Sequence, residues 1–238
     1  MAKGTILVTG GAQRIGKALC LNLAKQGYNI ALHYNSSSSE AKKIQTTIRK
    51  SKRRCEIFQS DLSVAAQCQT LMSQVHQKFK NIAGLINNAS IFHPTQFLGS
   101  NHRKLAENFA VHLQAPYILS QEFAKTIKKG NIINMLDCNI TNVETYHFDY
   151  LLSKKSLQNL TEQLAFALAP HIRVNAIAPG FILPPDKTSK FSEKQRLQTV
   201  PLRKKGSVDN ITQAVTFVLK NSFITGQTIF VDGGEHLN

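Results

Sequence analysis

The segment that decides the fold lies near the start of the chain and reads Thr5-Ile6-Leu7-Val8-Thr9-Gly10-Gly11-Ala12-Gln13-Arg14-Ile15-Gly16. Its apolar, β-branched run predicts a buried strand, and a helical pattern of apolar residues follows from about Arg14 to Gln26. The glycines between them predict a tight turn that lets a pyrophosphate approach the backbone, beside the unpaired N–H groups of the helix start. The alternative is an ordinary strand-to-helix turn.

The same alternation of strand and helix continues along the chain. Further strands are predicted at 29–34, 56–59, 84–87, 131–135, 173–178 and 228–231, and helices at 37–52, 64–79, 102–128, 149–168 and 208–220. A Pro-rich stretch between the last two helices is expected to be irregular. Alternating elements require parallel pairing through right-handed crossovers. We therefore expect one α/β domain over residues 1–238, a doubly wound parallel sheet of about seven strands with helices on both faces.

Composition excludes several classes of protein. Apolar residues make up 42% of the chain and charged residues 18%, unlike a disordered or collagenous sequence. No apolar run approaches the roughly 18 residues of a membrane span, and the N-terminal run is too short for a signal peptide. The four cysteines have no C-x-x-C spacing. We expect neither a metal site nor a disulfide framework, and reduced thiols indicate a cytoplasmic protein.

The net charge of +15 arises from 29 Lys and Arg against 14 Asp and Glu. Such an excess favours anionic partners, which include nucleic acids, phosphorylated cofactors and acidic substrates. The alternative is a solvated basic surface without a partner.

The end of the second strand predicts the kind of dinucleotide. Enzymes that use NAD place a carboxylate there for the ribose 2′-hydroxyl, whereas this chain has no acid before Glu40. Hydroxyl and amide groups, together with Arg14, are suited to a 2′-phosphate and predict NADPH. The residues are Tyr34, Asn35, Ser36 and Ser37. The serines could also simply cap the next helix. Asp61 and Leu62, after the third strand, are predicted to meet the adenine amine.

One tyrosine has a lysine four residues later, which is the spacing of two residues on one helix face. These residues are Tyr150 and Lys154. A neighbouring ammonium favours the phenolate form of a tyrosine, which makes the phenol a better proton donor near neutral pH. The pair is therefore a candidate catalytic site.

Four motifs in order resemble the short-chain dehydrogenase/reductases over essentially the whole chain. They are the T-G-x-x-x-x-x-G turn from Thr9 to Gly16, Asn87-Asn88-Ala89, Tyr150 with Lys154, and Pro179-Gly180. The resemblance implies a Rossmann fold, NAD(P) chemistry, a homotetramer and a substrate lid at about residues 180–206. It places the cofactor against Gly10, Arg14, Ile15, Asn88, Ala89, Ser90, Tyr150, Lys154, Pro179 and Gly180.

Three departures from the usual pattern resemble the pteridine reductase branch of that family. Arg14 replaces a glycine of the turn, Asp137 stands where most members have a catalytic serine, and Asn87-Asn88-Ala89 is followed by Ser90 rather than glycine. The resemblance implies that Ser90 contacts cofactor and pterin, and that Phe92 stacks on the pterin ring. Plain core packing of Phe92 is the alternative.

Two further details resemble the bacterial dihydromonapterin reductases. His112 stands where most members carry a helix-kink asparagine, and the chain ends Asp232-Gly233-Gly234-Glu235-His236. His112 is either a proton relay of a different kind or only a satisfied helix residue.

Three functions are open at this point. The first is NADPH-dependent reduction of a dihydropterin (dihydromonapterin, dihydrobiopterin or dihydrofolate) to its tetrahydro form, as in folate and tetrahydrobiopterin metabolism. Asp137, Tyr150 and Lys154 would be catalytic, and Ser90, Phe92, Asp137 and Tyr150 would bind substrate. The second is reduction of a ketone such as a 3-oxoacyl thioester. The third is a non-catalytic module that senses NADP or binds nucleic acid. The intact tyrosine–lysine pair argues against the third function. The basic residues are also not interleaved with aromatic residues as in a nucleic-acid-binding motif.

Overall fold

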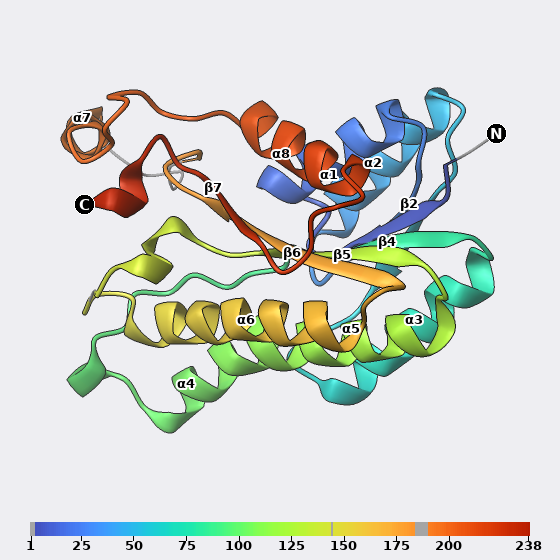
Figure 1. Ribbon diagram of the computed structural model, residues 1–238, viewed down its shortest axis with the longest axis horizontal. Helices are drawn as coiled ribbons and strands as arrows, with labels where there is room; N and C mark the ends of the chain where they lie inside the picture. The colour runs from blue at the N-terminus through green and yellow to red at the C-terminus, as the bar shows by residue number, and fades with distance from the viewer. Residues whose placement is uncertain (1–2, 144, 184–189) are drawn as a thin grey trace.

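The computed structural model describes residues 3–143, 145–183 and 190–238 and has the predicted fold (Figure 1). Within them one parallel sheet has the strand order β3-β2-β1-β4-β5-β6-β7. Its strands are β1 (Thr5–Val8), β2 (Asn29–Tyr34), β3 (Cys55–Gln59), β4 (Ile82–Asn87), β5 (Gly130–Met135), β6 (Ile172–Pro179) and β7 (Thr228–Val231). The order reverses between β1 and β4, which is where ligands bind in doubly wound sheets.

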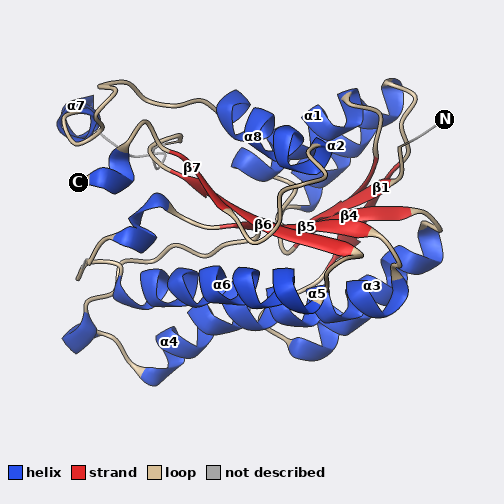
Figure 2. Ribbon diagram, in the orientation of Figure 1, coloured by secondary structure: helices blue, strands red, loops and turns tan. Residues whose placement is uncertain are grey.

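Helices cover both faces of the sheet (Figure 2). One face carries α1 (Arg14–Lys25), α2 (Ser38–Lys50) and α8 (Val208–Lys220), and the other carries α3 (Ala65–Lys78), α4 (His102–Phe109), α5 (Ala115–Thr126) and α6 (Phe148–Ala167). Ile6 and Val8 of β1 belong to the first core, and Leu7 between them belongs to the second. The side chains of a strand alternate between its faces, so two apolar cores form with the sheet between them.

The helix predicted at 102–128 is interrupted in its middle. Between α4 and α5 lies η2, a π-helical turn over Ala110–Gln114. Pro116 follows at the start of α5 and has no N–H to donate to the carbonyl of His112. The helix therefore widens into a π-helical turn at this point, and the buried His112 side chain belongs to that turn.

The stretch after β6 is more regular than the sequence predicts. It contains α7 (Lys190–Leu197), where the Pro-rich composition predicts irregular chain. Residues 184–189 of the predicted lid lie outside the described residues. Among the helices that the structure describes, none has the length and apolar character that a membrane span requires.

Candidate active site

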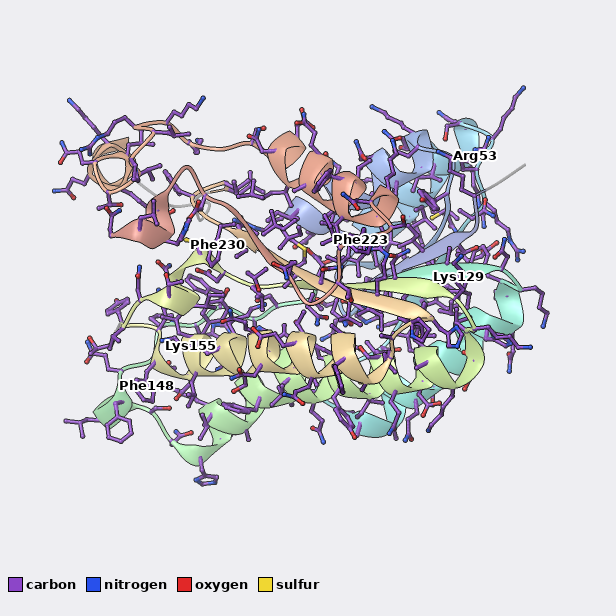
Figure 3. All side chains as sticks on the ribbon, viewed as in Figure 1. Arg53, Lys129, Phe148, Lys155, Phe223 and Phe230 are labelled. Carbon is purple, nitrogen blue, oxygen red and sulfur yellow. The ribbon has the colours of Figure 1, made fainter. Side chains whose placement is uncertain are left out.

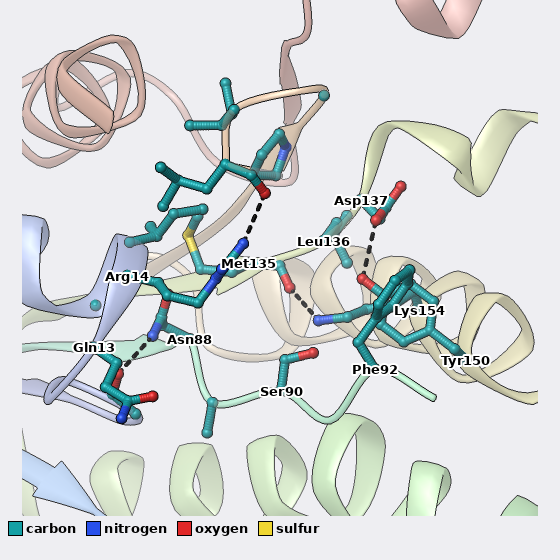
Figure 4. Close-up of a pocket in the computed structure, with 18 of the residues that line it drawn as sticks. Gln13, Arg14, Asn88, Ser90, Phe92, Met135, Leu136, Asp137, Tyr150 and Lys154 are labelled. Atoms are coloured by element: carbon teal, nitrogen blue, oxygen red, sulfur yellow. Dashed lines mark hydrogen bonds between the residues drawn. The ribbon is translucent and has the colours of Figure 1, made fainter. Parts of the chain in front are cut away.

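A cleft of about 820 Å³ opens at the carboxyl ends of β1 and β4, where the strand order reverses. It contains nearly all residues that the sequence marks as cofactor or substrate contacts. These are Gly10, Arg14, Ile15, Tyr34, Asn35, Ser36, Ser37, Asn88, Ala89, Ser90, Phe92, Asp137, Tyr150, Lys154, Pro179 and Gly180. Figure 4 shows how several of them face one another across the cleft.

The glycine turn has the geometry that a pyrophosphate site requires. Gly10 has a φ of 61°, and a Cβ there would lie 2.9 Å from the Cα of Ala89. Arg14 also has a positive φ, of 49°, so it keeps the left-handed conformation for which glycine is the usual residue. No side chain caps the N-terminus of α1. The start of that helix lines the cleft, where a helix N-terminus is suited to an anionic ligand.

A buried histidine holds this turn against the neighbouring strands. The Gly10 N–H donates to His33 Nδ1 at 3.1 Å, and His33 Nε2 lies 3.0 Å from the carbonyl oxygen of Ser60. His33 is therefore neutral, with its proton on Nε2. Burial lowers the pKa of His33 to about 4, although Ser60 and Asp61 oppose this shift. The sequence analysis did not single out His33, because its partners come from two other strand ends.

The end of the cleft beside β2 carries no acid among its described lining residues. Tyr34, Asn35, Ser36 and Ser37 form this end, and the carboxylates of the lining, Asp137 and Glu235, come from other elements. Asp61 and Leu62 are not part of the lining. The Asp61 carboxylate instead accepts hydrogen bonds from the N–H and hydroxyl of Ser63. The predicted adenine contact thus remains a prediction.

At the other end, Tyr150 donates its hydroxyl proton to Asp137 Oδ2 at 3.0 Å. Asp137 Oδ1 accepts the N–H of Asn139 at 2.9 Å, which fixes the carboxylate. The Lys154 Nζ donates to the carbonyl oxygen of Met135 at 2.7 Å, at the end of β5. Both Tyr150 and Lys154 are buried on α6. The predicted catalytic residues therefore lie together.

The environment keeps the Tyr150 hydroxyl protonated. Burial raises the pKa of Tyr150 well above its ordinary value, and Asp137 raises it further. This direction is opposite to the one that the Tyr–Lys spacing predicts, because a buried phenolate beside a carboxylate is costly. Burial lowers the pKa of Lys154 to about 8, partly opposed by Asp137. The site thus holds a tyrosine proton ready for transfer rather than a phenolate.

Phe92 is not a core residue. Half of its side chain (51%) is exposed, and it lines the cleft. Its ring lies edge-on to Tyr150 at 4.8 Å between centroids and tilted against His147 at 4.2 Å. The alternative of core packing is therefore wrong, and a half-exposed aromatic ring lies beside the Tyr150 ring in the cleft. His147 is a lining residue that the sequence analysis missed.

Long-range contacts build the outer wall of the cleft. Arg14 Nη2 donates to the carbonyl oxygen of Leu183 at 2.7 Å, which links the glycine turn to the loop after β6. The Glu235 carboxylate accepts the N–H of Phe181 at 2.9 Å and pairs with Arg196 of α7 at 3.2 Å. Arg196 and Glu235 were not among the predicted site residues, and no local pattern in the sequence marks them.

Comparison with known proteins identifies the family. A family model described as enoyl-(acyl carrier protein) reductase matches residues 10–236. The chain belongs to the short-chain dehydrogenase/reductase family. This confirms the family prediction and makes the chain an oxidoreductase.

The family members that this chain resembles are named for more than one kind of substrate. The FolM alternative dihydrofolate reductase 1 of Brucella canis, solved with NADP, superposes with a TM-score of 0.95 at 36% identity, over 100% of this chain and 95% of that one. Pteridine reductase 1 of Leishmania tarentolae is 28% identical over 97% of this chain and 96% of its own. A 3-oxoacyl-[acyl-carrier-protein] reductase of Staphylococcus epidermidis is also 28% identical, over 97% and 98%.

Proposed function

We propose that this short-chain reductase uses NADPH to reduce a dihydropterin to its tetrahydro form. The observation that carries the proposal is the hydrogen bond from Tyr150 to Asp137. A serine at position 137 would donate a hydrogen bond to a ketone oxygen, whereas a carboxylate only accepts. Such an acceptor suits a substrate that presents N–H groups, as a pterin does. The exposed face of Phe92 supports the same proposal, because it offers a stacking surface to a flat heteroaromatic ring.

The residues of the cleft fit NADPH. The uncapped start of α1 and the close approach of Gly10 to Ala89 suit the pyrophosphate. The segment from Tyr34 to Ser37 offers hydroxyl and amide groups and no carboxylate to the 2′-phosphate. The resemblance of the sequence to NADPH enzymes and the NADP in the Brucella structure agree with this choice.

The chain's own groups account for the proton that the reaction needs. When bound, NADPH supplies a hydride to C6 of the imine-type bond of the pterin. The nitrogen of that bond must then gain a proton, and the buried Tyr150 hydroxyl is the positioned donor. The Lys154 ammonium lies under the same site and stabilises the negative charge that Tyr150 acquires. Asp137 orients the hydroxyl until it transfers its proton.

Reduction of a 3-oxoacyl thioester is the second candidate. The likeness to 3-oxoacyl-[acyl-carrier-protein] reductases of staphylococci favours it. Asp137 argues against it, for the reason given above.

A direct assay separates the two candidates. NADPH oxidation is followed with dihydromonapterin, dihydrobiopterin, dihydrofolate and an acetoacetyl thioester, and the Tyr150→Phe variant serves as the control that retains the fold. We expect turnover with at least one dihydropterin, little with the thioester, and loss of most activity in the variant. Turnover with the thioester alone would overturn the proposal.

We further propose that the enzyme works as a homotetramer in the cytoplasm, with residues 180–206 as its lid. Two exposed aromatic side chains support the assembly. Phe166 of α6 is 91% exposed. Phe223, beyond α8, is 99% exposed and is labelled in Figure 3. Exposed aromatic side chains of this kind offer apolar contacts to other copies of the chain. Light scattering measures the mass of the assembly in solution and tests the tetramer. The four buried free cysteines agree with a reducing compartment.

A further inference from the structure

Two departures from the usual family pattern meet in the structure. Ser90 stands in place of a glycine and His112 in place of an asparagine, 22 residues later. The Ser90 Oγ lies 3.0 Å from His112 Nε2, and the N–H of Ile91 donates to the same nitrogen at 3.2 Å. His112 is buried, with 1% of its surface exposed. The two residues therefore form one unit rather than two independent changes.

The hydrogen bonds define which nitrogen of His112 carries the proton. The Ile91 N–H can only donate, so Nε2 is unprotonated and accepts. On the other side of the ring, Nδ1 lies 2.9 Å from the Ser153 hydroxyl oxygen, and that hydroxyl donates to the carbonyl oxygen of Tyr150 at 2.7 Å. Nδ1–H therefore donates to Ser153. Burial and the nearby Lys154 lower the pKa of His112 well below its ordinary value, in agreement with a neutral ring.

This tautomer joins the Ser90 loop to the helix that carries Tyr150. The Ser90 hydroxyl also lies near the Tyr150 side chain, where it lowers the Tyr150 pKa against the larger effects of burial and Asp137. The Ser90 hydroxyl proton thus has three acceptors within reach, the neutral His112 Nε2 at 3.0 Å, the Ile91 carbonyl oxygen at 3.3 Å and the Tyr150 oxygen. A phenolate accepts far more strongly than a phenol, so transfer of the tyrosine proton turns the Ser90 hydroxyl towards Tyr150.

We propose that His112 is a positioning residue that holds the Ser90 hydroxyl beside Tyr150, where that hydroxyl stabilises the phenolate formed during reduction. The inference rests on Tyr150 as proton donor, which is part of the proposed function. It holds for a dihydropterin and equally for a ketone substrate, because Tyr150 delivers a proton in both reactions. His112 itself neither gains nor loses a proton, so it is not a relay.

Two substitutions at position 112 each keep half of this arrangement. In His112→Gln the side-chain amide extends as far as Nε2 and can accept from Ser90 and Ile91. In His112→Asn the shorter amide reaches only as far as Nδ1 and can donate to Ser153. Each variant is assayed on whichever substrate the wild-type enzyme turns over, and Ser90→Ala is assayed beside them. Circular dichroism checks that each variant is folded, and NADPH affinity is a second check for the position-112 variants, because Ser90 is itself a predicted cofactor contact.

We expect kcat to fall about tenfold or more in Ser90→Ala and in His112→Asn, the range for losing a hydrogen bond to a charged group. KM for NADPH should not change in His112→Asn, and His112→Gln should stay within about threefold of the wild-type kcat. The double variant Ser90→Ala/His112→Asn should be no slower than the slower single variant, since both remove one interaction. Wild-type kcat in His112→Asn would overturn the proposal.

A measurement on the unaltered protein tests the geometry without any substitution. Nitrogen-15 NMR of labelled histidine should show the His112 proton on Nδ1 and none on Nε2. A proton on Nε2 would overturn the inference, even if the enzyme reduces dihydropterins. If the wild-type enzyme reduces only the thioester, the pterin proposal fails while the position-112 variants still decide the role of His112.

Discussion

Among single residues, Asp137 has the most direct effect on the Tyr150 hydroxyl, since its Oδ2 accepts that proton. We expect Asp137→Ser to cut dihydropterin reduction by about 10²-fold or more, the range for losing a positioned acid–base partner. NADPH affinity should remain nearly unchanged. Steady-state rates and cofactor titration measure the two effects. Asp209→Ser removes an exposed carboxylate on α8, outside the cleft, and is the matched control. Equal rates in wild type and Asp137→Ser would remove Asp137 from the chemistry.

Phe92 contributes an open ring face rather than core packing. We expect Phe92→Ala to raise the inhibition constant of a planar diaminopteridine antifolate about 2- to 12-fold, because stacking adds roughly 0.5–1.5 kcal/mol beyond burial. Competition assays against a dihydropterin, with NADPH present, measure the constant. Phe97→Ala changes an exposed phenylalanine outside the cleft and should leave it unaltered. An unchanged constant in Phe92→Ala would show that the inhibitor does not stack there.

Sequence patterns predict site residues that are local and fail for those held by distant partners. The spacing of Tyr150 and Lys154 on one helix, and the order of the motifs, are visible in the chain itself. Glu235 is different, because its role depends on the Phe181 N–H, 54 residues earlier. The direction in which the Tyr150 pKa shifts also depends on burial, and the spacing of residues in the sequence does not reveal burial.

At the scale of elements, the ends of the strands determine which cofactor fits. The segment after β2 offers Ser36, exposed and uncharged, where NAD enzymes place a carboxylate. We expect Ser36→Asp to weaken NADPH binding about tenfold or more, because its carboxylate repels the 2′-phosphate. NADH binding should change little. Calorimetric titration of both cofactors tests this, with Ser36→Asn as the uncharged control. If Ser36→Asp weakened the binding of NADPH and NADH equally, the 2′-phosphate would not lie beside Ser36.

Elements with strong periodicity are found where the sequence predicts them, and the exceptions have physical causes. The strands are short, mostly continuous apolar runs, as in a sheet covered on both faces, and most helices follow an apolar period of 3.6 residues. The helix at 102–128 is divided because Pro116 has no N–H to donate to the helical hydrogen bonds. This changes one turn only, so the apolar period of the sequence does not reveal it. Helix α7 is rich in Lys, Glu, Gln and Arg, which favour helix, but the prolines before it favour irregular chain.

At the scale of the whole molecule, the +15 charge and the sheet topology serve the same site. The reversal of strand order places the cleft at the carboxyl ends of β1 and β4. A strongly basic molecule attracts anions, among them the phosphates of NADPH. The charge alone does not predict the fold or the reaction, which is why the sequence left nucleic acid open as a partner until the motifs were considered.

Acid should destabilise the whole fold through two buried histidines. His33 and His112 are both neutral because each accepts a backbone N–H, from Gly10 and Ile91 respectively. The pKa of His33 is lowered to about 4 by burial, and that of His112 is also lowered. Below pH 6.5 the unfolded chain binds protons that the folded chain does not, so the free energy of unfolding decreases as the pH falls towards 4.

For His33 alone the loss should reach roughly 3 kcal/mol between pH 6.5 and 4, from 1.36 kcal/mol for each unit of pKa difference. Urea unfolding at a series of pH values measures it. His33→Gln is the matched control, because its amide extends as far as Nε2 and can donate to Ser60 but does not titrate. Its stability should depend less steeply on pH than that of the wild type over this range. Parallel curves for the two proteins would mean that His33 takes up its proton without unfolding, and that the hydrogen bond to Gly10 does not keep the ring neutral.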